Sequence, residues 1–275
     1  MTQTASPTID FAALKQRQQA TWASGDFSVV GARIVFQAEL LVETADLQSG
    51  WRVLDVATGS GNAALAAARR GCHVVGLDYV PALLERGRQR ASAEQLSVEF
   101  LTGDAEDLPF PDASFDAVTS IYGAMFAPNH ERAALEMARV CRQGGRIALA
   151  CWTPGGFIGE TFKLFSRFIP PVAGLQPPVR WGEEAHQRKL FGASAASIAV
   201  YPRTAIFRFP SAEENVAFFR TWYGPTLKAF EALDASRREA LSRELAELAR
   251  RFDRNRGQGP IAIAADYIET VITRA

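Results

Sequence analysis

The segment Val53–Gly71 reads VLDVATGSGNAALAAARRG and joins a short apolar run, a glycine-bearing turn and an alanine-rich stretch. The apolar run predicts a buried strand, and the alanine-rich stretch predicts a helix that ends with Arg69 and Arg70 in its last turn. A glycine turn between a strand and a helix leaves backbone N–H groups at the helix N-terminus, where they attract an anionic group. The segment therefore predicts the first unit of a fold that holds a nucleotide-like cofactor.

Strand-like and helix-like segments alternate from Arg52 to Trp152. The predicted strands are Trp51–Ala57, Cys72–Asp78, Ser97–Leu101, Phe115–Ile121 and Gly145–Trp152, and the helices between them are Asn62–Arg70, Pro81–Ala93 and Pro128–Arg142. Because each strand is followed by a segment long enough to cross over the sheet, the alternation predicts a doubly wound α/β fold with a mostly parallel sheet.

The rest of the chain has other patterns. Apolar residues at helical spacing come before the alternating segment, and segments rich in glycine, proline and aromatic residues come after it. We divide the chain accordingly into an N-terminal helical lid at 1–47, a cofactor-binding core at 48–152, helical cap insertions at 153–195 and 211–258, and final strands of the sheet at 196–210 and 259–275.

Charge and cysteine content exclude several partners and sites. The chain has 275 residues, 48% of them hydrophobic, and its 30 Lys and Arg balance its 30 Asp and Glu. Nucleic acid and anionic membranes select basic surfaces, so neither is a predicted partner, and no apolar stretch approaches the roughly 18 residues of a membrane span. Cys72, Cys141 and Cys151 lie in apolar runs and read as core residues, so we predict no metal site and a cytoplasmic location.

Acidic residues follow three consecutive predicted strands. Asp55 precedes Gly59 at a place where a carboxylate would repel a pyrophosphate, although the letters GSGNAA match a dinucleotide turn. Asp78 ends the second strand, where an acid accepts hydrogen bonds from both ribose hydroxyls. Asp104 follows the third strand and can accept a hydrogen bond from an adenine amine. Such a negative rim favours a cationic sulfonium nucleoside over a dinucleotide diphosphate.

From Arg52 to Trp152 the chain resembles the class I S-adenosylmethionine-dependent methyltransferases, within them the small-molecule branch of ubiquinone and menaquinone C-methyltransferases. The segments that carry this resemblance are VLDVATGSGN, VVGLD, GDAEDLPFPDASFDAV and ERAALEMARVCRQGGRIALACW. The resemblance implies a Rossmann-like sheet of seven strands with an antiparallel last strand. It also implies S-adenosylmethionine as cofactor, S-adenosylhomocysteine as product and a small molecule as methyl acceptor.

The resemblance also implies a place for each part of the cofactor. The methionine portion lies on the glycine loop, the ribose on Asp78, and the adenine between Tyr79 and the segment at Asp104. The expected cofactor-binding residues are Asp55, Ala57, Thr58, Gly59, Gly61, Asp78, Tyr79, Asp104, Ala105 and Ser120.

Two positions depart from the family pattern. Ala57 stands where the family usually has glycine, and because alanine favours negative φ we expect a slightly different turn there. Phe126 stands where many members have a histidine. Candidate catalytic residues are therefore Tyr122, His130 and His186, and a reaction that uses no protein base stays open. The expected substrate-binding residues are Trp22, Phe27, Tyr122, Phe126, Trp152, Phe162 and Trp181.

The predicted reaction is methyl transfer to oxygen or carbon of a small, apolar, aromatic or polyketide-like metabolite, with alignment of the reactants supplying much of the acceleration. Three alternatives stay open. The enzyme can use S-adenosylmethionine as a fixed cation for cyclisation, rearrangement or decarboxylation, it can be an NAD-dependent oxidoreductase, or the chain can be a binding module without catalysis. A homodimer also stays open, because an aromatic cap suits a lid as well as an interface.

Overall fold

The structure is a computed structural model that describes residues 10–275. The strands in this range are β1 (Arg52–Val56), β2 (His73–Asp78), β3 (Val98–Thr102), β4 (Phe115–Ile121), β5 (Cys141–Trp152), β6 (Ala195–Phe209) and β7 (Ile261–Arg274). The helices are α1 (Phe11–Trp22), α2 (Phe27–Gly31), α3 (Val35–Thr44), α4 (Asn62–Arg69), α5 (Pro81–Ala93), α6 (His130–Val140), α7 (Phe157–Phe168), α8 (Glu184–Phe191), α9 (Ala212–Trp222), α10 (Gly224–Glu231) and α11 (Ala235–Arg251).

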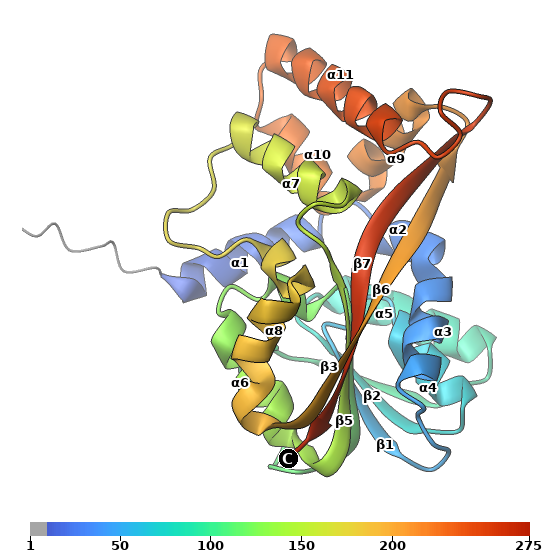
Figure 1. The fold of residues 1–275 in the computed structure, drawn as a ribbon, viewed down its shortest axis with the longest axis vertical. Coiled ribbons are helices and arrows are strands. Elements are labelled where there is room, and N and C mark those ends of the chain that lie inside the picture. The colour runs from blue at the N-terminus through green and yellow to red at the C-terminus, as the bar shows by residue number, and fades with distance from the viewer. Residues whose placement is uncertain (1–9) are drawn as a thin grey trace, which may run out of the picture.

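The strands form one sheet in the order β3-β2-β1-β4-β5-β7-β6. β1 pairs in parallel with β2 and β4, whereas β7 runs antiparallel to both β5 and β6. In Figure 1, α6 and α8 lie on one side of the sheet and α3 and α4 on the other. The predicted doubly wound, seven-stranded sheet with an antiparallel last strand is confirmed.

The central strands are apolar on both faces because helices cover both faces. Val53, Leu54 and Val56 of β1 are fully buried. The fifth strand begins earlier than predicted, at Cys141 instead of Gly145, and the register between β4 and β5 shifts over this stretch. The predicted helix before it correspondingly ends at Val140.

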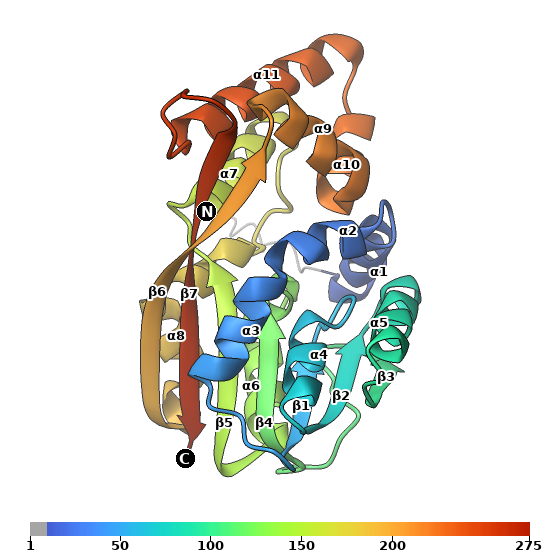
Figure 2. The same cartoon turned by 90° about the vertical axis from the view of Figure 1, so that its right-hand side faces the viewer.

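A helical cap lies beyond one end of the sheet. β6 and β7 extend past the other strands and carry α9, α10 and α11, with α7 packed against α11 (Figures 1 and 2). The predicted insertion at 153–195 is divided in space, since α7 joins the cap whereas α8 packs on α6 beside the sheet. Across residues 10–275, no helix is both long enough and apolar enough to cross a membrane.

The turn between β1 and α4 has left-handed backbone at three positions. Ala57 has φ 53°, Gly59 has φ 56° and Gly61, which precedes α4, has φ 85°. Our expectation that Ala57 would avoid positive φ is wrong. The residue adopts a left-handed conformation that glycine takes readily and alanine does not, so the turn carries backbone strain at this position.

Replacing Ala57 by glycine tests this strain. We expect Ala57→Gly to raise the free energy of unfolding by about 1 kcal/mol, because glycine adopts positive φ without a steric penalty. Urea denaturation measures the change. Ala66→Gly is the control, because this buried alanine lies inside α4, where glycine lowers stability by about 1 kcal/mol. Equal losses in the two variants would contradict the assignment of strain to Ala57.

Candidate active site

Asp55 lies near the end of β1 and is fully buried. It forms hydrogen bonds to the turn that follows β1 and to α4. Its carboxylate accepts hydrogen bonds from Thr58 Oγ1 at 2.5 Å, Thr119 Oγ1 at 2.9 Å and the Ala64 backbone N–H at 3.1 Å. Burial raises the pKa of Asp55 to about 6. Within the described chain its side chain lies outside the lining of the nearby cavity, so Asp55 shapes the loop that a ligand would contact.

Asp78 ends β2 and joins the turns that follow β1 and β2. Its two carboxylate oxygens accept hydrogen bonds from the backbone N–H groups of Gly59 and Val80, each at 2.9 Å. The side chain is buried, and burial raises its pKa to about 6. Unlike Asp55, Asp78 lines a cavity at the carboxyl ends of the central strands.

We call this cavity the strand-end cavity. It lies where open α/β sheets bind their ligands. The predicted cofactor-binding residues in its wall are Ala57, Thr58, Gly59, Asp78, Tyr79, Asp104 and Ala105. Gly61 and Ser120 stand behind the wall, where the Ser120 hydroxyl donates to the Val56 carbonyl at 2.7 Å and ties β4 to β1.

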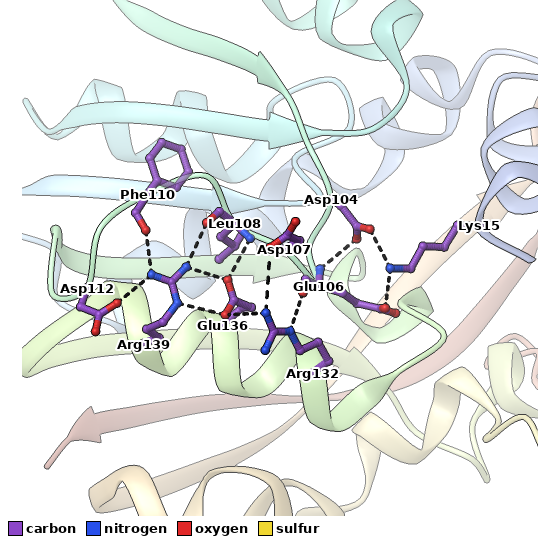
Figure 3. A network of polar contacts seen from close by, with 10 residues as sticks. All are labelled: Lys15, Asp104, Glu106, Asp107, Leu108, Phe110, Asp112, Arg132, Glu136 and Arg139. Carbon is purple, nitrogen blue, oxygen red and sulfur yellow. Dashed lines mark hydrogen bonds and ion pairs between the residues drawn. The ribbon is translucent and has the colours of Figure 1, made fainter. Parts of the chain in front are cut away.

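Lys15 of α1 reaches the rim of this cavity (Figure 3). Its Nζ lies 2.7 Å from Asp104 Oδ2 and 2.5 Å from Glu106 Oε2. Glu106 is 5% exposed, and its other oxygen accepts a hydrogen bond from the Asn129 N–H at 2.7 Å. Sequence analysis missed Lys15 and Glu106. The ion pair reduces the negative charge of the predicted acidic rim.

Side chains of α6 hold the loop that carries Asp104 in place (Figure 3). Glu136 accepts a hydrogen bond from the Leu108 N–H at 2.9 Å, and Arg139 donates to the Leu108 carbonyl at 2.9 Å. The Arg139 guanidinium also holds the pKa of Glu136 below its usual value. The position of Asp104 therefore depends on α6, which follows it in the chain.

Helix α1 forms one wall of the strand-end cavity. The side-chain amide of Gln18 donates to the Phe126 carbonyl at 3.3 Å, and that of Gln19 donates to the Tyr79 carbonyl. The ring of Trp22 meets Phe126 edge-on, with 4.9 Å between their centroids. These contacts and the Lys15 ion pair fix α1 over the cavity.

A second cavity, the cap cavity, lies between the sheet and helices α7, α9 and α10. The predicted substrate-binding residues Trp22, Phe27, Tyr122, Phe126, Trp152 and Phe162 line it. Five described residues line both cavities: Trp22, Phe27, Ile34, Tyr122 and Phe126. The two cavities therefore share one wall.

Tyr122 stands at this shared wall in a strained conformation. Its φ is 52°, and its ring stacks on Trp152 with 3.8 Å between centroids and 7° between planes. Burial raises the pKa of Tyr122 well above that of a free phenol. The phenol is neutral at physiological pH, which does not suit it to act as a base.

The structure does not bring His130, His186 and Trp181 to either cavity, as far as the chain is described. His130 Nδ1 lies 3.0 Å from His186 Nε2, and the His130 ring meets the Trp181 ring edge-on. Burial lowers the pKa of both imidazoles, to about 4 for His130. They form a neutral pair between α6 and α8. The Asn129 side chain caps α6 by accepting a hydrogen bond from the Arg132 N–H.

Comparison with known proteins agrees with this geometry. Residues 54–149 match the family model of a methyltransferase domain. A protein of Mycobacterium tuberculosis without assigned function is 36% identical over 252 residues, which are 90% of this chain and 92% of that protein. The demethylmenaquinone methyltransferase of Deinococcus radiodurans is 43% identical over 127 residues, 45% of this chain and 53% of that enzyme.

A solved structure shows the same fold. The YcgJ protein of Bacillus subtilis aligns with a TM-score of 0.58 at 24% identity, over 86% of this chain and 98% of that chain. The segment matched by the family model contains β2, β3 and β4 in full, most of β1 and β5, and every predicted cofactor-binding residue. The chain belongs to the class I S-adenosylmethionine-dependent methyltransferases, the family whose methyl donor is S-adenosylmethionine.

Proposed function

We propose that the enzyme methylates oxygen or carbon of a small, largely apolar molecule with an aromatic or polyketide-like skeleton. The observation that carries this proposal is the apolar cap cavity, which shares a wall with the strand-end cavity. Apolar walls with few polar groups are typical of pockets for small organic ligands. The methyl acceptor would occupy the cap cavity and the cofactor the strand-end cavity.

The residues of the strand-end cavity suit the cofactor. The buried Asp78 carboxylate would accept hydrogen bonds from the ribose hydroxyls, and Tyr79 and Ala105 would flank the adenine. Backbone N–H groups of the turn before α4 would receive the methionine carboxylate. When bound, S-adenosylmethionine supplies a methyl group activated by the adjacent sulfonium. Trp22, Phe27 and Phe126 would exclude water from the reacting atoms.

The acceptor must bring its own acidic proton. Among the described residues of the cap-cavity wall, none is an aspartate, glutamate, histidine, lysine or cysteine. Tyr122 is held as a neutral phenol, and His130 and His186 lie elsewhere. A phenol or enol that ionises readily needs no protein base. The enzyme would then act by aligning the two reactants and by excluding water from them.

Isotope labelling tests the transfer. S-adenosylmethionine with a ¹³C methyl group is incubated with the enzyme and a panel of phenols and β-diketones, and the products are examined by mass spectrometry. We expect products that carry the labelled methyl group. Turnover that requires the cofactor but yields unlabelled product would contradict methyl transfer and favour cyclisation, rearrangement or decarboxylation.

Cofactor affinity should depend on pH through Asp78. Because its pKa is about 6, Asp78 is protonated below that pH and loses its charge-assisted hydrogen bonds. We expect affinity for S-adenosylhomocysteine to fall as pH decreases through 6, by at most about tenfold per unit. Asp78→Asn should lower affinity roughly tenfold or more at pH 7.5 and make the pH dependence shallower.

Calorimetric titration between pH 5 and 8 measures this effect. Asp107→Asn is the matched control, because its side chain is 87% exposed in the loop after β3, and it should behave as the wild type. An unchanged pH dependence in Asp78→Asn would show that another group titrates.

Helix α1 should control cofactor exchange. Lys15→Met removes the cation between Asp104 and Glu106, so α1 should open more often and S-adenosylhomocysteine should dissociate about fivefold faster or more. Stopped-flow displacement measures the rate. Lys163→Met is the control, because Lys163 forms an exposed pair with Glu160 on α7. Equal dissociation rates in Lys15→Met and wild type would contradict a lid role for α1.

A further inference from the structure

We infer that Asn215 binds a carbonyl-type oxygen of the methyl acceptor, so that the acceptor is an apolar ring system that carries a ketone oxygen. This inference rests on the proposed use of the cap cavity as the acceptor site. Asn215 lies on α9, lines the cap cavity and is 3% exposed. Its Nδ2 has no hydrogen-bond partner among residues 10–275.

An unpaired buried amide is unfavourable, because it has lost its hydrogen bonds to water and gained none in return. Thr161, a polar neighbour in the same wall, shows the usual solution, since its hydroxyl donates to the Phe157 carbonyl at 2.8 Å. The Nδ2 donor of Asn215 has no such bond to any residue in the range 10–275. A ligand in the cavity can supply the missing acceptor.

Asn215 is held in position by its helix. Ser211 caps α9 by accepting a hydrogen bond from the Glu214 N–H at 3.1 Å, and the Asn215 N–H donates to the Ser211 carbonyl at 3.2 Å. One turn further on, Phe219 packs edge-on against Phe207 of β6, with 5.7 Å between centroids. The amide is therefore preorganised, and a ligand that pairs with it does not have to order the helix.

The surroundings of Asn215 select a neutral partner. The described wall contains no cationic side chain, so a carboxylate or phosphate would lose its hydration without gaining a counter-charge. An NH₂ donor pairs with a lone pair, which a ketone oxygen supplies.

The test uses two probes that differ by one carbonyl oxygen, 1-tetralone and tetralin. Binding to the full chain, saturated with S-adenosylhomocysteine, is followed by the fluorescence of Trp22 and Trp152 in the cavity wall. We expect Asn215→Leu to weaken 1-tetralone binding about five- to tenfold and to leave tetralin binding unchanged or stronger. Thr221→Val is the control, because Thr221 lies on α9 outside both cavities and its hydroxyl already donates to the Ala217 carbonyl at 2.8 Å; it should change neither affinity by more than about twofold.

Equal effects of Asn215→Leu on the two probes, no effect on either, or failure of the wild type to bind 1-tetralone would overturn the inference. Urea denaturation checks the fold, and we expect Asn215→Leu to be at least as stable as wild type because it removes an unpaired buried amide. If the leucine variant does not fold, Asn215→Ala replaces it with the same expected difference between probes. Binding is measured without turnover, so failure of methyl transfer would overturn the proposed function alone.

Discussion

The buried carboxylate of Asp55 is the contact on which the site depends. It joins the end of β1 to Thr58 in the turn, to Ala64 in α4 and to Thr119 in β4. A carboxylate in this position is costly to bury, and its hydrogen bonds offset that cost only in this backbone arrangement. The shape of the turn, including the left-handed Ala57, follows from this arrangement, and the wall that faces the ligand follows from the turn.

The strands and helices from β1 to β5 could be predicted from the sequence because each depends on residues that are close together in the chain. The strand, turn and helix of Val53–Gly71, and the acid that ends β2, belong to short segments with a clear period and clear end signals. The resemblance to a methyltransferase family extended these segments to the whole sheet. Ala57 shows the limit of a local rule, since a preference of about 1 kcal/mol against positive φ was outweighed by tertiary contacts.

The rest of the site depends on contacts between distant segments. Lys15 meets Asp104 across 89 positions of sequence, and nothing in a single sequence pairs them. His130 and His186 read as candidate catalytic groups by residue type, yet they face one another between α6 and α8. Asn215 belongs to no recognisable sequence motif. Only its position in the wall of the cap cavity distinguishes it from a surface amide. Such features arise from packing, which periodicity does not encode.

The wall common to the two cavities limits how this enzyme can diverge. On the proposed assignment of the cavities, a substitution at Trp22, Phe27 or Phe126 would alter the surroundings of both ligands, because these residues line both cavities. Residues of α7 and α9 line the cap cavity alone. On the same assignment, substitutions in these two helices would change the acceptor that the enzyme accepts and leave the wall of the cofactor cavity unchanged, so acceptor specificity could diverge through the cap alone.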